Sequence, residues 1–257
     1  MKIATWNVNS IRARLPRLLD WLGRTQPDVV CLQELKVPDD DFPIEEIRTA
    51  GYRAVFHGQR TYNGVGILSR TEPSDVVVGL EGGADEDQAR LIAATIAGVR
   101  FLSAYFPNGQ TVGSDKWAYK LDWMSRLKRH LAERYSPRDP LVLCGDFNVA
   151  PEDRDVARPD EWAGSVLCQD EARQALKAIA AWGLVDAVRL HHEGPGPYSW
   201  WDYRMLAFPK GNGLRIDHLF LTQPLAARCT AAFVDRNERK GKLPSDHAPV
   251  LIELGDR

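Results

Sequence analysis

The sequence predicts an α/β fold in which two β-sheets pack face to face with helices on the outside. Short apolar runs typical of strands occur along the whole chain. Amphipathic stretches separate them into two strand-rich halves, each with its own helices, and such halves are typical of layered sheets. We see no linker or low-complexity tract in the 257 residues. Residues 1–257 are therefore expected to form a single domain, within the prior that this length sets.

The chain is expected to begin with a strand, a helix and a second strand. KIATWNV at 2–8 alternates between apolar and polar residues and ends in asparagines. Ser10 is a suitable N-cap for a helix whose leucines at 15, 18, 19 and 22 share one face. DVVCLQE at 28–34 is a continuous apolar run that ends in charge, typical of a strand buried on both faces.

A hairpin and further strands are expected next. YRAVFHG at 52–58 and GVGILSR at 64–70 predict a hairpin, with Asn63-Gly64 near its turn. Three further strands are predicted, with Gly98 as a tight turn between the last two. They span 74–80, 89–97 and 99–106.

The middle of the chain predicts the longest helix. In residues 114–135, Leu121, Met124, Leu127 and Leu131 share one face, and Ser114 is a suitable cap. PLVLCGD at 140–146 predicts a buried strand, and residues 147–165 form a long loop of the kind that usually has a function. A helix over 169–182 follows, and then five strands. These span 184–188, 197–201, 215–222, 226–234 and 248–254.

Polar side chains stand at the ends of several predicted strands. Ligand sites in layered α/β folds gather at such strand ends. Asp146 and Asn148 are two residues apart and therefore face the same side of an extended segment. Carboxylate and amide oxygens without thiols suit Mg²⁺ or Mn²⁺ better than zinc, and together with a histidine they equip a site for metal-assisted phosphoester hydrolysis. The strand-end residues are Asn7, Gln33, Glu34, Tyr105, Asp146, Asn148, Asp217, Asp246 and His247.

Several motifs together resemble the exonuclease III family of DNA-repair nucleases, within the endonuclease/exonuclease/phosphatase superfamily. They are TWNVNSIRAR, LQELK, GDFN, GLRID and SDHAPV, and the segments YFPNG and SWWDYR add to the likeness. The resemblance spans about residues 1 to 254. It implies a four-layer sandwich of two mixed sheets flanked by helices. It also implies a Mg²⁺-dependent enzyme, with Mn²⁺ as a substitute, that hydrolyses phosphodiesters in duplex DNA. The implied activities are those of an abasic-site endonuclease, a 3′-5′ exodeoxyribonuclease and a 3′-phosphodiesterase that acts on blocked 3′ ends.

The resemblance also implies a role for each strand-end residue. Glu34 is the principal metal ligand, with Asn7 beside it and Asp246 as a further ligand or a group linked to the metal. Asp146 is the general base, Asn148 holds the scissile phosphate, and both lie at the metal. His247 contacts a phosphate oxygen, also at the metal site, and is oriented by Asp217. Tyr105 supports the phosphate or the attacking group.

A lesion pocket is a further implication of the resemblance. Trp200 and Leu214 match positions that form a wall against an extruded abasic sugar. Arg204 flanks this pocket, and Asn212 lies in the adjoining GNG segment. Because Trp200 and Trp201 are neighbours in an extended segment, at least one of them is expected in the core.

The charge balance alone does not indicate nucleic acid, since 33 basic and 35 acidic residues give a net charge of −2. Local basic groups near the motifs are expected to bind the phosphate backbone. Among the basic residues of the central helix, Lys116, Lys120, Lys128 and Arg129, about half are expected to be surface groups. The acidic runs 39–41 and 81–87 lie in other loops. The basic groups near the motifs are Arg12, Arg14, Arg17, Arg204, Lys210, Arg236, Arg239, Lys240 and Lys242.

The four cysteines form no CxxC pair, so a zinc site is not expected, and Cys31 and Cys144 are expected to be buried free thiols. No signal peptide or apolar run of about 18 residues is present. A cytoplasmic protein with no membrane partner is therefore expected. We also expect a monomer.

Three other functions are alternatives for this sequence. A lipid or inositol phosphate phosphatase of the same superfamily would share the metal site. A non-catalytic DNA-binding protein on this fold should have lost ligands. A serine hydrolase would have to use Ser245, but the adjacent Asp246 and His247 do not form a relay easily and no GxSxG motif is present.

Overall fold

The computed structural model describes residues 1–80 and 88–255, so the acidic run 81–87 lies outside the described residues. Within the described residues, twelve strands form two six-stranded sheets. In spatial order, the first sheet contains β11 (Cys229–Val234), β12 (Val250–Leu254), β1 (Lys2–Asn7), β2 (Val29–Gln33), β4 (Val65–Ser69) and β3 (Arg53–His57). The second contains β5 (Ser74–Val78), β6 (Leu91–Ile96), β7 (Val99–Tyr105), β8 (Leu141–Asp146), β10 (Asp217–Thr222) and β9 (Leu184–Asp186).

Both sheets are mixed. β1 runs parallel to β2 and β7 runs parallel to β8, whereas the other neighbouring strands are antiparallel. β3 and β4 form the predicted hairpin.

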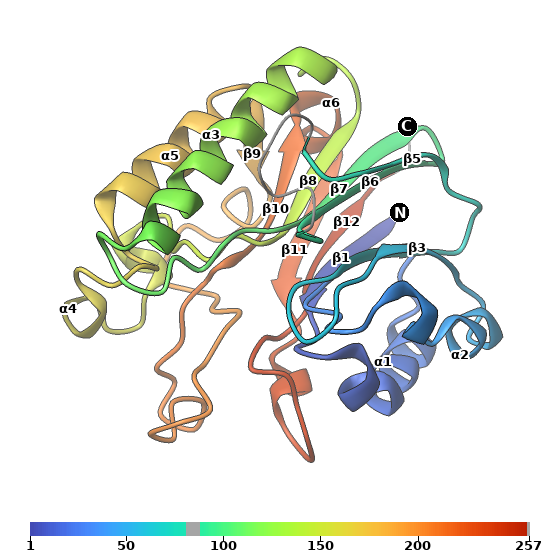
Figure 1. Cartoon of the computed structure of the whole chain (residues 1–257), viewed down its shortest axis with the longest axis horizontal. Helices are drawn as coiled ribbons and strands as arrows, with labels where there is room; N and C mark the ends of the chain where they lie inside the picture. Colours follow the sequence, from blue (N-terminus) through green and yellow to red (C-terminus); the bar gives the residue numbers. More distant parts are fainter. Residues whose placement is uncertain (81–87, 256–257) are drawn as a thin grey trace.

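Helices cover the two outer faces of this pair of sheets (Figure 1). α1 (Ile11–Thr25) and α2 (Ile44–Thr49) pack on the first sheet. α3 (Asp115–Arg134) and α5 (Asp170–Ala180) pack on the second. Two short helices, α4 (Pro159–Trp162) and α6 (Gln223–Ala226), lie in connections. The predicted fold class, four layers with the sheets in the middle, is confirmed.

The predicted helix caps are present. The Ser10 hydroxyl accepts a hydrogen bond from the Ala13 N–H at 3.4 Å, and the Ser114 hydroxyl accepts one from the Trp117 N–H at 3.2 Å. Each cap satisfies an N–H that has no partner within its own helix.

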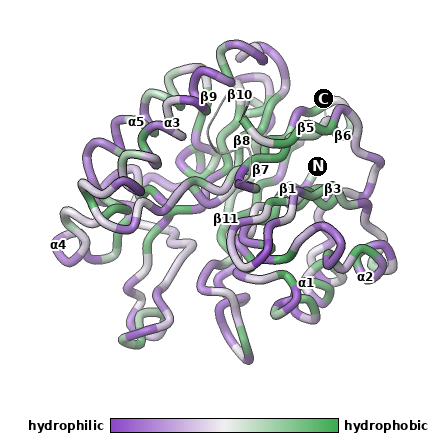
Figure 2. The backbone as a smooth tube through the Cα atoms, in the orientation of Figure 1, coloured by the Kyte–Doolittle hydropathy of each residue, from purple (hydrophilic) through white to green (hydrophobic). Residues whose placement is uncertain are grey.

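The main core lies between the sheets, where the inner side chains of both interdigitate. Cys31 of β2 and Cys144 of β8 are buried there as free thiols, as predicted. Figure 2 shows hydrophobic residues concentrated along the strands and hydrophilic ones along the outer helices and loops. None of the helices in the described segments is long and apolar enough to cross a membrane.

The predicted strand at 197–201 is wrong. Only isolated bridges form there, from Trp200 to Leu214 and from Trp200 to His247. Pro197 has no N–H to give to a ladder, and the N–H groups of Ser199 and Trp200 both donate to the Leu214 carbonyl. The segment is therefore a loop, and its two bridges place Trp200 next to Leu214 and His247.

Candidate active site

The registers of the central strands place the predicted polar residues at one end of the sandwich. Parallel pairing sets Asn7 of β1 opposite Gln33, directly before Glu34. In the second sheet, Tyr105 pairs with Asp146 across β7 and β8, and Asp217 pairs with Asp146 across β10 and β8.

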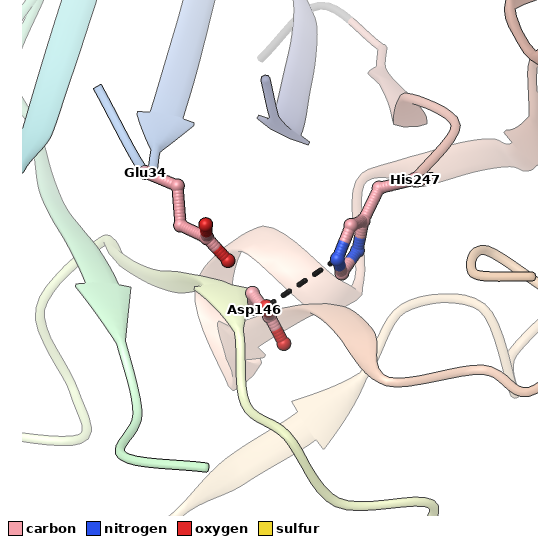
Figure 3. A group of neighbouring side chains, drawn as sticks. All are labelled: Glu34, Asp146 and His247. Atoms are coloured by element: carbon pink, nitrogen blue, oxygen red, sulfur yellow. Dashed lines mark ion pairs between the residues drawn. The ribbon is translucent and has the colours of Figure 1, made fainter. Parts of the chain in front are cut away.

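Three of these residues converge closely enough to hold a metal ion (Figure 3). One ligand atom each from Glu34, Asp146 and His247 lies within 4.8 Å of the others. Asp146 and His247 are almost completely buried, and Glu34 is partly exposed. The two carboxylates offer the hard oxygen ligands that suit a divalent cation.

Asn7 holds the two carboxylates of this group together. Its amide nitrogen donates to Glu34 Oε1 and to Asp146 Oδ2, both at 2.9 Å. Its amide oxygen accepts the N–H of Asn9 at 2.9 Å. In this arrangement Asn7 faces the cluster with its donor side and fixes the spacing of the two carboxylates.

His247 lies between two aspartates. Its Nδ1 is 2.9 Å from Asp217 Oδ2, and this oxygen accepts a 2.6 Å hydrogen bond from Ser199. Its Nε2 is 3.7 Å from Asp146 Oδ2. Burial opposes a charge on the imidazole, but the Asp217 and Asp146 carboxylates outweigh burial and raise the pKa of His247 to about 10. The ring is therefore a fixed cation beside Asp146.

The pKa of the Asp146 carboxyl group lies above its usual range. Burial raises its pKa to about 7, and the neighbouring Asp217 and Glu34 carboxylates act in the same direction, against the opposing effect of His247. This excess of negative charge is what a bound cation would relieve.

Asn148 follows Asp146 at a sharp bend, where its φ is 49°. Its N–H donates to Asp146 Oδ1 at 2.9 Å and its amide nitrogen donates to the Phe106 carbonyl at 3.0 Å. The Asn108 amide donates to Asn148 Oδ1 at 3.0 Å. These bonds fix the orientation of the Asn148 side chain next to the cluster.

Tyr105 and Asp246 flank the same group. Burial raises the pKa of the Tyr105 phenol well above its usual range, and the nearby carboxylates of Glu34 and Asp146 add to the effect. The phenol is thus a neutral hydrogen-bond donor. Asp246 accepts hydrogen bonds from Asn9 at 2.9 Å and from the Trp200 indole at 3.0 Å.

Lys36 belongs to this site and was given no role by the sequence analysis. Its ammonium group is 2.7 Å from Glu34 Oε2 and 2.6 Å from Asn9 Oδ1. Its position in the LQELK motif was the available signal, but the motif did not indicate which way the side chain points. The contact neutralises part of the charge on Glu34.

The predicted lesion-pocket residues lie beside His247. The Trp200 ring is partly exposed, 6.5 Å from the His247 ring, and it packs on Trp162 and on Leu214, which is fully buried. Trp201 is only 1% exposed and belongs to the core.

A pocket opens next to Trp162, and the two polar residues predicted for the lesion site line it. Arg204 is exposed and pairs with Asp202 at 3.0 Å. The Asn212 amide donates to Glu161 at 3.2 Å. The pocket is lined by Arg158, Glu161, Trp162, Asp202, Arg204, Met205, Ala207, Lys210 and Asn212.

The predicted basic groups divide into two kinds. Arg14 and Arg17 donate to carbonyl groups of residues 238–244 and so hold this loop, and Arg239 is buried, where it donates to the Ser245 and Trp201 carbonyls. Arg239 was expected to face phosphate, and that expectation is wrong. Lys240 and Lys242 remain exposed on the loop that these arginines support.

Comparison with known proteins identifies the family. A family model described as the endonuclease/exonuclease/phosphatase family matches residues 4–247. The chain belongs to this family. The name of this family covers both nucleases and phosphatases.

Relatives place this endonuclease/exonuclease/phosphatase protein with the exonuclease III branch, as the motifs predicted. It is 33% identical to Exodeoxyribonuclease III of Haemophilus influenzae, covering 99% of the chain and 100% of that protein. It is 42% identical to an AP endonuclease structure from Archaeoglobus fulgidus, with a TM-score of 0.96 and 99% of both chains covered. A 3′ phosphatase from Neisseria, solved with a product DNA hairpin, is 41% identical with a TM-score of 0.95, again over 99% of both chains.

Proposed function

We propose that this protein is a DNA-repair nuclease that hydrolyses phosphodiesters in duplex DNA, at abasic sites and at blocked 3′ ends. The convergence of Glu34, Asp146 and His247 on one open site carries the proposal. The full-length similarity to an exodeoxyribonuclease, an AP endonuclease and a DNA-bound 3′ phosphatase supports it.

We propose Mg²⁺ as the cofactor, with Mn²⁺ as a substitute. Glu34 and Asp146 supply the hard oxygen ligands, and Asn7, Asn148, Asp246 and His247 complete the surroundings of the ion. The bound ion would polarise a phosphate oxygen and stabilise the charge that develops on the leaving group.

The side chains of the site suit the attack of water on phosphorus. Asp146 accepts a proton from the attacking water, because its carboxylate is held next to the cluster by Asn7 and the Asn148 N–H. One N–H of the Asn148 amide is used by the Phe106 carbonyl, and the other serves a phosphate oxygen. His247, kept charged and oriented by Asp217, stabilises the negative charge of the transition state. The neutral Tyr105 phenol donates a hydrogen bond to the phosphate or to the attacking group.

We further propose that two loops near the site contact the DNA. Residues 202–211 and 236–246 project side by side from the same end of the molecule (Figure 1). They are joined where Arg236 donates to the Phe208 carbonyl and stacks on the Phe208 ring. Lys210, Lys240 and Lys242 are the lysines that these loops carry, and Lys240 and Lys242 are exposed.

A salt titration tests this DNA surface. Lys240→Ala is expected to weaken binding to all duplexes alike and to reduce the slope of log affinity against log salt by about one unit. The Lys240 side chain is exposed, and among the described residues its ammonium group donates only to Asn237, so removal of the side chain disturbs little else. Lys128→Ala, on the outer face of α3, is the control and should leave the slope unchanged. An unchanged slope for Lys240→Ala would assign Lys240 to the solvated surface.

Trp200 is proposed as the wall of a pocket that selects a sugar without a base. The buried Leu214 packs against Trp200 and supports it. Trp200→Ala is expected to reduce the ratio of abasic-site incision to removal of an undamaged 3′ nucleotide by about 10-fold or more, and to reduce hydrolysis itself less. The ratio and the melting temperature are measured on the same preparation.

Trp201 provides the control for that experiment. It is buried, so Trp201→Ala is expected to cost about 3 to 5 kcal/mol of stability. Trp200 is partly exposed, so Trp200→Ala should cost clearly less. A large loss of stability in Trp200→Ala with an unchanged ratio would place Trp200 in the core and reject its role in selection.

We also propose that residues 1–257 act as one domain, as a monomer in the cytoplasm. The pairing of β1 with β12, in which Lys2 lies opposite Glu253, supports one unit because it closes the two ends of the described chain into one sheet.

The proposed function is tested with a labelled duplex that carries one abasic analogue. We expect incision at the analogue in Mg²⁺, slower 3′ trimming of a matched undamaged duplex, and loss of both activities in EDTA. Phosphate release from lipid or inositol phosphates without DNA cleavage would assign the chain to a phosphatase branch of the family instead.

A further inference from the structure

Lys120 is an ionisable side chain with no contact to solvent, and burial lowers the pKa of its amine to about 7. It lies on α3, on the face that packs against the second sheet, and its exposed fraction is 0%. The other basic residues considered on this helix, Lys116, Lys128 and Arg129, are exposed. Burying an ammonium group has a large free-energy cost unless every donor is satisfied, so the environment of Lys120 must supply acceptors.

Three backbone carbonyls supply them. Lys120 Nζ donates to the Asn148 carbonyl at 2.7 Å, to the Val166 carbonyl at 2.8 Å and to the Asn108 carbonyl at 3.1 Å. An ammonium group has three N–H donors, so each of them has one carbonyl acceptor. The three carbonyls belong to three different segments, the loops after β7 and β8 and the end of the long loop before α5.

Two of these segments carry amides that meet at the active site. Asn108 donates from its side chain to Asn148 Oδ1, and the Asn148 N–H donates to Asp146. Lys120 therefore binds the backbone carbonyls of both asparagines, while their side chains face the site. Asn148 also adopts a φ of 49°, a conformation that needs support from its surroundings.

The turn that contains Asn108 rests directly on the lysine stem. At Gly109, which has a φ of 93°, a Cβ atom would lie 3.1 Å from Lys120 Cδ and 3.0 Å from the Trp117 ring. The positive φ favours glycine at this position of the YFPNG segment, and Lys120 and Trp117 leave little room for a larger residue. The Trp117 ring also lies 5.4 Å from the ammonium group.

We propose that Lys120 is a positioning residue for phosphodiester hydrolysis: its ammonium group fixes the backbone of Asn148 and Asn108, and thereby the amide that binds the scissile phosphate. The inference rests on the proposed function. It gives Lys120 no contact with the substrate, so its effect is transmitted entirely through Asn148.

Single-turnover cleavage of a duplex with one abasic analogue tests the proposal. Lys120→Met keeps most of the stem and removes the ammonium group. We expect the rate constant of chemistry to fall by about 10- to 100-fold, as for supporting residues around other sites, with the affinity for the duplex little changed. Lys128→Met, which lies exposed on the same helix, should match the wild type. Circular dichroism and the melting temperature establish that each variant is folded at the assay temperature.

A double-mutant cycle separates positioning from a general structural role. If Lys120 acts through Asn148, then Lys120→Met combined with Asn148→Ala should be no slower than Asn148→Ala alone, within about twofold. If Lys120 only stabilises the fold, the two losses should multiply. Should Lys120→Met not fold, Lys120→Gln, which keeps two N–H donors, carries the same cycle.

The outcomes distinguish this proposal from the proposed function. Loss of cleavage in the wild type and in Lys128→Met would reject the nuclease function itself. Normal cleavage by both, with a rate for Lys120→Met within about twofold of the wild type or with losses that multiply in the cycle, would overturn the role of Lys120 alone.

Discussion

Replacement of Asp146 by asparagine is expected to slow the chemical step by about 10²- to 10⁴-fold, the usual effect of losing a general base. The side chain is buried and lies between the Asn7 amide and the Asn148 N–H, so bulk water cannot take its place. Asparagine keeps the shape but cannot accept the proton. Single-turnover kinetics measure the rate, and fluorescence anisotropy with labelled duplex in EDTA measures binding.

Binding should be affected far less than chemistry in Asp146→Asn. Asp20→Asn, at an exposed position of α1, is the control for the same change of charge and should behave as the wild type. If affinity and rate fell in equal proportion in Asp146→Asn, Asp146 would be a binding or structural residue and the proposed general base would have to be sought elsewhere.

Glu34→Gln is expected to have the other large effect, because it removes a charge from the metal site while keeping the shape of the side chain. At an effective dielectric constant of about 20, two unit charges about 4 Å apart interact by about 4 kcal/mol. We therefore expect the affinity for Mn²⁺ or Mg²⁺ to fall by about 10²-fold or more, and turnover at a fixed Mg²⁺ concentration to fall by orders of magnitude. Isothermal titration with Mn²⁺ measures the affinity without reference to activity.

High metal concentration should restore part of the activity of Glu34→Gln. The exposed Glu45, on α2, gives the control Glu45→Gln, which should bind metal as the wild type does. Activity of Glu34→Gln close to that of the wild type in dilute Mg²⁺ would show that Glu34 is not the principal ligand.

The meeting of Asn7, Glu34, Asp146 and His247 at one end of the molecule could be predicted because each follows or precedes an apolar strand. Strand ends are local features of a sequence, and layered folds bring them together. The loop at 197–201 was wrongly predicted as a strand, since only the position of Leu214 determines where the N–H groups of that segment go.

Contacts between distant loops could not be predicted. Nothing near Lys120 in the sequence indicates that carbonyls of residues 108, 148 and 166 will surround it. Likewise, Arg239 lies in a basic run typical of a surface, but its guanidinium group is buried and donates to the Trp201 and Ser245 carbonyls.

The burial of the two neighbouring tryptophans also depends on contacts with residues that are distant in the sequence. Strand-like alternation predicted that one of Trp200 and Trp201 is in the core but not which one. Gly213 decides, because a Cβ atom there would come within 2.3 Å of the Trp201 indole nitrogen. Trp201 is thereby packed against a backbone that only glycine provides, and Trp200 is left facing the site.

The most direct test of the account is cleavage of a natural abasic duplex in ¹⁸O-labelled water with Mg²⁺, followed by mass spectrometry of the fragments. Attack of water on phosphorus, assisted by Asp146, predicts that one ¹⁸O atom enters the phosphate of the product and that EDTA prevents its formation. Strand cleavage with no ¹⁸O in the phosphate, as elimination at the sugar would give, or cleavage that persists in EDTA, would contradict it.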